Sequence, residues 1–327
     1  MNKNYTSKCN YLDHVEKKFE ECFKDKNYNY EESVMITSKI DESVDFVGSK
    51  ISPLKKYIVN DDIPLNGVAT IQNCMKMRSL KTLKDYSYKM FGSCYRGMGT
   101  LTEFNLEKVI SDTFDYFLNS KYLRVNPYDL CIRINSNDKD LKESISVVNK
   151  DVIREYDTEK DEDYKHKYGM DDYNITGRNL NIAMRKGNTD VFHDCAAIII
   201  METKSKKIAI DMGIGNSTLA MCHFNTESTV AASRFGDIID IKDVATMKFA
   251  DSMIAVSTLL NEDILNHSSK HFRKKFRQYV SSLRFWKNEL NIDDYDILNY
   301  MNEYLKLEYK DNKSISEEVY RKVLYKK

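Results

Sequence analysis

The stretch that most constrains the fold of this chain runs from residue 195 to residue 224. "CAAIIIMET" and "IAID" are two apolar runs separated by the polar "KSKK", and they predict the two antiparallel strands of a hairpin. Gly213 and Gly215 follow the second strand. The next residues, "NSTLAMCHF", predict a helix with Asn216 or Ser217 as its N-cap. The third glycine of a dinucleotide-binding loop is absent, so the pair favours close packing of the helix on the sheet.

Composition indicates a globular protein but leaves its partners open. The chain has 327 residues, enough for about two domains, and it is 42% hydrophobic and 31% charged. Fifty basic residues balance fifty acidic ones, so only a local patch could indicate nucleic-acid binding. No apolar run approaches the ~20 residues of a transmembrane helix, and the polar N-terminal sequence has no signal-peptide core. We therefore expect a cytoplasmic protein with no membrane partner.

The cysteines do not predict a metal site. Seven are scattered along the chain, their number is odd, and none belongs to a C-x-x-C pair, which predicts reduced thiols. His193 lies near Cys195, and Cys222 precedes His223, but neither pair has a second pair at ligand spacing.

Periodicity predicts the other elements. Apolar residues at helical spacing predict amphipathic helices over 11–25 and 104–123. The alternating "SVMITSKI" (33–40) predicts a strand, and "NPYDLCIRIN" (126–135) predicts a turn and a strand. The acidic run 157–173 predicts a solvated loop.

The hydrophobic pattern of the sequence changes after about residue 240. Four successive segments, which begin at "VATMKFADSM", "SSKHFRKKF", "YDILNYMNEY" and "SISEEVYRKV", carry helical periodicity. The patterns predict an α+β domain followed by a helical domain.

Several segments together resemble the alanyl-tRNA synthetases, a family of class II aminoacyl-tRNA synthetases. "IDMGIGNSTLAM" is similar to the family's motif 3, D-T-G-M-G-L-E-R, with Asp211, Gly213 and Gly215 in the matching positions. "ATIQNCMKM" is similar to T-S-Q-R-C-V-R, and "MFGSCYRGMGTLTEF" lies where the family has F-F-E-M-L-G-N-F-S-F-G-D-Y-F. "FADSMIAVSTLLNEDIL" is similar to a segment of the helical tRNA-recognition domain. The resemblance spans roughly residues 12–290 and rests on order and spacing.

The resemblance implies a fold and a function. The fold is a class II synthetase-like antiparallel sheet flanked by helices over residues 1–240, followed by an all-helical, tRNA-recognition-like domain over 241–327. The function is that of a ligase: ATP-dependent activation of alanine or another small amino acid as an adenylate, with Mg²⁺, and transfer to tRNA or another acceptor. The family's editing domain and its zinc ligands have no counterpart here. A homodimer is one open possibility for the assembly.

Positions in the matched motifs imply roles in that reaction. Adenylate formation needs cations on the ATP phosphates, where charge develops. The motif 2 arginine falls on Lys76, and Arg78 and Arg96 are further phosphate candidates, with Gly215 at the ATP site. Asp211 matches the aspartate that holds the substrate ammonium group, and Gly213 leaves room for a small side chain.

One position departs from the family. Thr218 stands where motif 3 has an arginine, and threonine carries no charge. This departure leaves two further functions open. One is a non-catalytic pseudo-synthetase that binds an amino acid or tRNA as a sensor or accessory subunit. The other is a recast pocket that acts on aminoacyl-tRNA without ATP.

A basic stretch between residues 268 and 288 contains no acidic residue. Such a helix can neutralise phosphates, or it can be an amphipathic helix whose cations face water. Phe272, Phe276 and Tyr279 share one helical face, which predicts that they pack in the core. The resemblance to the tRNA-recognition domain favours a tRNA contact through Lys270, Arg273, Lys274, Lys275 and Arg277.

Overall fold

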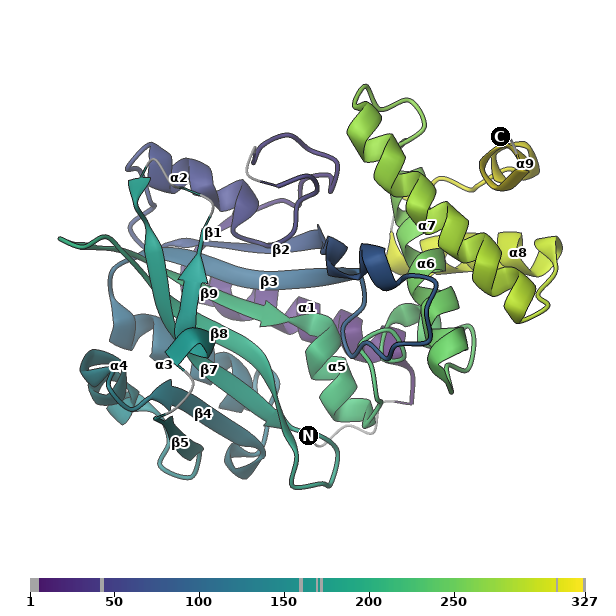
Figure 1. Cartoon of the computed structure of the whole chain (residues 1–327). Coiled ribbons are helices and arrows are strands. Elements are labelled where there is room, and N and C mark those ends of the chain that lie inside the picture. Colours follow the sequence, from purple (N-terminus) through teal and green to yellow (C-terminus); the bar gives the residue numbers. More distant parts are fainter. Residues whose placement is uncertain are drawn as a thin grey trace.

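The computed structural model describes residues 6–41, 44–158, 161–168, 170, 173–309 and 311–325, without the side chains of residues 78, 79 and 161. Among these residues one nine-stranded sheet forms the centre of the molecule, with helices on its faces and a helical region at one end (Figure 1). The strands are β1 (Asn29–Glu31), β2 (Val68–Met75), β3 (Cys94–Glu103), β4 (Leu130–Asn135), β5 (Ile153–Asp157), β6 (Lys165–Lys167), β7 (Thr176–Arg185), β8 (Phe192–Glu202) and β9 (Lys207–Gly215).

The sheet is mixed and mainly antiparallel. Its strand order is β1-β2-β3-β9-β8-β7-β4-β5, and β6 pairs with β7. The β1–β2 and β4–β5 pairs are parallel, whereas the other pairs of described strands are antiparallel. The predicted hairpin at 195–211 is confirmed as β8 and β9. The architecture is the predicted α+β class, an antiparallel sheet flanked by helices and followed by a helical region.

Three helices cover one face of the sheet, α1 (Lys8–Asp25), α3 (Leu106–Leu118) and α5 (Asn216–Phe224). The side chain of Ser7 caps α1 by accepting from the Asn10 amide, and the side chain of Asn105 caps α3 in the same way. The apolar faces of these helices pack on inward-facing residues of the strands in one core cluster. The two predicted amphipathic helices are thereby confirmed.

The opposite face of the sheet has a smaller cover, which includes α2 (Lys55–Val59) (Figure 1). Ile51, Leu54 and Leu101 form a separate core there with Tyr168 and Met170. Elsewhere the chain turns through one more short helix, α4 (Lys139–Ser144), and through the 3₁₀ segments Ser52–Leu54, Met77–Thr82, Pro127–Asp129, Ile145–Val147, Asp161–Tyr164 and Arg234–Asp237.

The four helices predicted after residue 240 are confirmed as α6 (Val244–Asn261), α7 (Lys270–Glu289), α8 (Asp294–Glu308) and α9 (Glu317–Tyr325). Phe272, Phe276 and Tyr279 of α7 are buried, as their shared helical face predicted. They belong to a core that also includes residues from the N-terminal half, such as Phe46, so the helical region packs tightly on the rest of the chain. The boundary between residues 240 and 241 stays a prediction.

The predicted strand over 33–40 is wrong, because side chains satisfy the backbone groups that a sheet would otherwise pair. The Gln72 side chain accepts from the Val34 amide and donates to its carbonyl. The Glu262 carboxylate accepts from the amides of Ile36 and Thr37, at 2.8 and 3.0 Å. Both partners lie far along the chain, beyond the reach of a local pattern.

Two further predictions are corrected. The acidic run 157–173 is not simply a solvated loop. Tyr164 and Tyr168 are buried, and the run contains β6, which pairs with β7. Residues 159, 160, 169, 171 and 172 of the run lie outside the described residues. The caps predicted at Asn216 and Ser217 are also wrong. β9 continues to Gly215, which is the N-cap of α5 and has no side chain to donate or accept.

Candidate functional site

Glycines at the centre of the sheet form a strip without side chains. β3 and β9 are neighbours, and their register places Gly97 opposite Gly215, Gly99 opposite Gly213, and Leu101 opposite Asp211. Because side chains alternate along a strand, these positions all belong to one face of the sheet, opposite the face that α1, α3 and α5 cover. Asp211 therefore stands at the end of a glycine-lined strip.

The side chain of Lys50 lies on this strip. A Cβ atom added at Gly99 would lie 2.6 Å from the Cε atom of Lys50, and one added at Gly213 would lie 3.3 Å from the same atom. At Gly97 the added atom would lie 3.3 Å from the Cβ atom of Lys50. The glycines thus make room for the lysine stem, a residue that the sequence did not single out.

The Lys50 ammonium group ends in a buried polar site. Its Nζ atom donates to the Oδ1 atom of Asp211 and, at 2.9 Å, to the carbonyl of Thr100. The hydroxyl of Tyr168 donates to the Oδ2 atom of Asp211 at 3.1 Å. Lys50 is 7% exposed and Asp211 3% exposed. The carboxylate that the resemblance assigns to the substrate ammonium is therefore paired with an ammonium of the chain itself.

Burial and the neighbouring charge have opposite effects on the pKa of Lys50. Burial lowers the pKa of the Lys50 ammonium, and the neighbouring Asp211 carboxylate opposes that shift. Burial, followed by the charge of Asp211, raises the pKa of Tyr168 well above its usual value, so its hydroxyl stays a donor. An ammonium and a carboxylate removed from water stabilise each other only while both are present.

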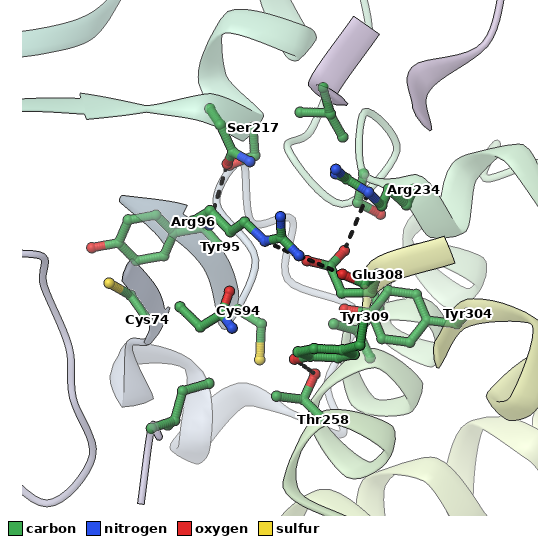
Figure 2. Close-up of a pocket in the computed structure, with 16 residues that line it drawn as sticks. Cys74, Cys94, Tyr95, Arg96, Ser217, Arg234, Thr258, Tyr304, Glu308 and Tyr309 are labelled. Carbon is green, nitrogen blue, oxygen red and sulfur yellow. Dashed lines mark hydrogen bonds and ion pairs between the residues drawn. The ribbon is translucent and has the colours of Figure 1, made fainter. Parts of the chain in front are cut away.

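A small cavity lies beside this strip, between the sheet and the helical region (Figure 2). It has a volume of about 40 Å³, which is room for a few water molecules. It lies next to the ends of β2 and β3 and the start of α5, and Arg96 is the predicted phosphate residue that lines it among the described side chains. Its walls include Cys74, Tyr95, Arg96, Ser217, Glu308 and Tyr309.

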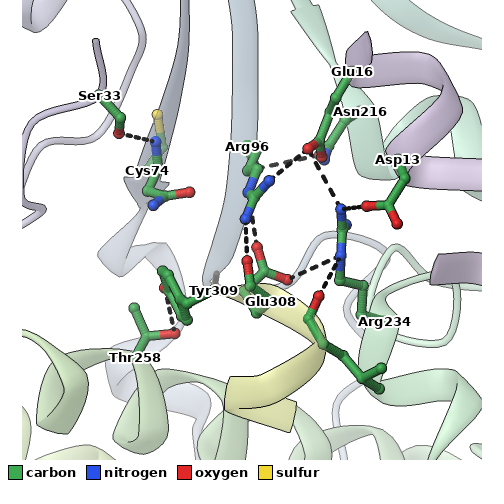
Figure 3. Close-up of polar contacts among 12 residues, drawn as sticks. Asp13, Glu16, Ser33, Cys74, Arg96, Asn216, Arg234, Thr258, Glu308 and Tyr309 are labelled. Atoms are coloured by element: carbon green, nitrogen blue, oxygen red, sulfur yellow. Dashed lines mark hydrogen bonds and ion pairs between the residues drawn. The ribbon is translucent and has the colours of Figure 1, made fainter. Parts of the chain in front are cut away.

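Arg96 belongs to a charge network at this cavity (Figure 3). Its guanidinium group forms ion pairs with Glu16 at 2.5 Å and with Glu308 at 2.8 Å. Arg234, which is 2% exposed, shares both carboxylates and also pairs with Asp13. The two arginines thereby join α1 to the end of α8. The acidic partners raise the pKa of both guanidinium groups although burial acts to lower it.

The other residues predicted for the ATP site follow β2, as Lys76 and Arg78 do, or end β9, as Gly215 does. Lys76 follows β2, and its Nζ atom lies 5.3 Å from the centre of the Tyr95 ring. The side chain of Arg78 lies outside the described part of the chain. Thr218 is buried in α5, with its Oγ1 atom 3.1 Å from the position of a Cβ atom on Gly215. Arg96 is already paired with two carboxylates, and the cavity has a volume of only about 40 Å³. The described residues therefore do not fit a triphosphate as they are arranged here.

The five predicted tRNA-binding cations divide into two groups on α7. Lys270, Lys274 and Arg277 are exposed. Lys275 pairs with Asp45, and Arg273 donates to the carbonyl of His267. The exposed group is available to a polyanion in solution.

Sequence reasoning missed Lys50 and Tyr168. Lys50 is a single cation in an otherwise unremarked segment, and Tyr168 lies in the acidic run that was predicted to be a loop. The only signal was indirect, since a strip of paired glycines implies that something lies against it. Among the described residues no group of three or more His, Cys, Asp or Glu side chains could hold a metal ion. None of the described helices is long and apolar enough to span a membrane.

Two alanine substitutions test the glycine strip. Gly99→Ala is expected to lower the free energy of unfolding by about 2–3 kcal/mol, because the added Cβ atom would lie 2.2 Å from the carbonyl oxygen of Met212. Gly213→Ala meets only the flexible end of Lys50 and should cost less than about 1 kcal/mol. Urea unfolding followed by circular dichroism measures both. Equal losses for the two variants would contradict the described strip.

Comparison with solved structures finds a likeness to aminoacyl-tRNA synthetases. The chain is similar to the S. aureus histidyl-tRNA synthetase, with a TM-score of 0.41, 11% identity and 64% of each chain covered. It is also similar to a Leishmania major Friedlin protein assigned as an aspartyl-tRNA synthetase, with a TM-score of 0.43, 11% identity, and coverage of 70% of this chain and 64% of that one. For the Entamoeba histolytica aspartyl-tRNA synthetase the TM-score is 0.38, the identity 10%, and the coverage 69% and 57%.

The matched region spans less than two thirds of each of these synthetases. No protein-family model matches the chain, and neither does any curated protein sequence. The residues of the site therefore carry the functional proposal.

Proposed function

We propose that this chain is a synthetase-like protein that binds tRNA through α7 and does not activate an amino acid while Lys50 holds Asp211. The observation that carries this proposal is the buried contact of the Lys50 ammonium with Asp211 on the glycine strip. Of the functions that the sequence left open, it corresponds to the non-catalytic pseudo-synthetase.

The Lys50 contact works against amino-acid binding for a physical reason. An α-ammonium group and the Lys50 ammonium would compete for the same carboxylate. Lys50 is tethered, so its effective concentration at the site is on the order of millimolar or higher, whereas a free amino acid also loses its translational freedom on binding. The buried ion pairs of Arg96 and the uncharged Thr218 act in the same direction, because neither side chain is available to stabilise charge that develops on a phosphate.

The exposed cations of α7 support the tRNA part of the proposal. Lys270, Lys274 and Arg277 lie on one helix whose opposite face is buried, so they can approach a phosphate backbone together. Neutralising phosphates releases condensed counterions, and this makes binding strongly dependent on salt.

The first test is binding of unfractionated tRNA at several salt concentrations. The triple variant Lys270→Ala, Lys274→Ala, Arg277→Ala is expected to bind more weakly at low salt. Its plot of log affinity against log salt should be less steep by about 2–3, because each lost phosphate contact contributes about 0.7–0.9. A matched control removes the exposed Lys150, Lys204 and Lys206, which lie outside α7, and should leave the slope unchanged. Equal effects of the two triple variants would refute the α7 site.

The second test is ATP–pyrophosphate exchange with each of the twenty amino acids. The wild-type protein is expected to give no exchange above the rate without amino acid. Exchange with alanine would instead support the enzyme that the resemblance implies, with ATP and Mg²⁺ as its cofactors. One observation favours that second candidate: Asp211, Tyr168 and the glycine strip form a site with the chemistry of a primary-ammonium pocket. Release of the amino acid from charged tRNA without ATP would support the recast pocket.

A further inference from the structure

We propose that residues 44–54, here called the lysine strap, block ligand binding at Asp211, and that tRNA binding on α7 favours release of the strap. The strap holds Lys50 in the ammonium site at one end and an α7 contact at the other. This inference rests on the proposed tRNA site and names the regulation of the Asp211 site.

The α7 contact is made by Asp45. Its carboxylate forms an ion pair with Lys275, and its Oδ1 atom lies 2.7 Å from the Nε2 atom of His271; both partners lie on α7. Both lie within the basic stretch that also carries the exposed Lys270 and Lys274. Asp45 is therefore the strap's link to the helix that we propose binds tRNA.

Apolar and backbone contacts continue from that link toward Lys50. The Phe46 ring stacks on Phe272 of α7, with ring centres 4.8 Å apart. The Val47 carbonyl accepts from the Met75 amide at 2.9 Å, and the Gly48 carbonyl accepts from the Tyr95 hydroxyl at 2.9 Å. The strap is thus a continuous connection from α7, across the ends of β2 and β3, to the glycine strip.

A phosphate backbone on α7 would weaken the Asp45 contact in two ways. Phosphates would compete with the Asp45 carboxylate for Lys275 and His271, and they would repel that carboxylate. Binding free energies are linked reciprocally. If tRNA binding favours release of the strap, release of the strap must raise the affinity for tRNA by the same factor. Displacement of Lys50 would then expose Asp211 and the glycine strip to a primary-ammonium ligand, such as an amino acid or the aminoacyl end of a charged tRNA.

Lysine acetylation by an amine-reactive ester, followed by mass spectrometry of the full chain, reads both sites at once. Adding unfractionated tRNA is expected to lower labelling of Lys270 and Lys274 and to raise labelling of the buried Lys50 about fivefold or more. The variant Asp45→Asn should show raised Lys50 labelling without tRNA and little further rise with it. The control Glu289→Gln also removes one negative charge from the region of α7 but leaves the strap contacts in place, so Lys50 should respond as in the wild type.

The outcomes separate the two proposals. Unchanged labelling of Lys270 and Lys274 would overturn the tRNA site, and the coupling with it. Protection of those lysines without a rise at Lys50 would overturn the coupling alone. A rise at Lys50 in Glu289→Gln without tRNA, equal to that in Asp45→Asn, would show that the Asp45 contact does not hold the strap.

Discussion

Lys50→Ala is expected to lower the free energy of unfolding by about 3–5 kcal/mol, because it leaves the buried Asp211 carboxylate without its ammonium partner. Tyr168 still donates to Asp211, but one hydroxyl does not compensate a full charge. The measurement is urea unfolding at pH 7. Lys56→Ala serves as the control, because Lys56 pairs with Glu31 at the surface, where such a pair is worth less than about 1 kcal/mol.

The same variant opens the ammonium site to small ligands. Truncation to alanine removes the atoms of a propylammonium ion, so propylammonium is expected to raise the unfolding temperature of Lys50→Ala in proportion to its occupancy. Lys50→Met, whose stem still covers the glycine strip, should not respond. L-Alanine as a second ligand tests the role predicted for Asp211 and Gly213. An equal response of both variants to propylammonium would mean that the stabilisation arises elsewhere.

Arg96→Met is expected to lower the free energy of unfolding by about 3–5 kcal/mol, because Glu16 and Glu308 would lose the guanidinium group that lies between them. Arg234 would remain close to both carboxylates, but at the longer distances of 3.4 and 3.8 Å. The loss of stability should therefore appear in the absence of any ligand, by urea unfolding followed through circular dichroism.

Two further variants establish the cause. Arg321→Met removes an exposed pair with Glu317 on a single helix and should leave the free energy of unfolding almost unchanged. Arg96→Lys keeps the charge but loses the planar two-pronged geometry, so an intermediate loss is expected. If Arg96→Met unfolds like the wild type, the network does not stabilise the junction of α1 and α8, and the phosphate role predicted for Arg96 regains support.

Local pattern predicted the long helices and the hairpin at the centre of the sheet. The helices α1 and α3, the hairpin of β8 and β9, and the four helices after residue 240 follow from periodicities of a few residues. Two of the predictions that proved wrong share one physical cause. At 33–40 the backbone bonds to the side chains of Gln72 and Glu262, and in the run 157–173 tyrosines are buried by distant strands. Such contacts join residues that are far apart in the chain, so local sequence patterns cannot predict them.

The sequence by itself determined that a carboxylate, Asp211, follows an apolar run and precedes two glycines, because residue order is a local property. It ended the strand at Asp211, whereas β9 continues through both glycines to Gly215. Only the tertiary structure decided what meets that carboxylate. Lys50 lies 161 residues away in the chain, and its ammonium reaches Asp211 because the register of β3 and β9 aligns glycines under the lysine stem. The sequence likewise marked Arg96 as a cation near a phosphate motif. The packing of α1 and α8 gave it two buried carboxylates instead, since a buried charge requires a partner.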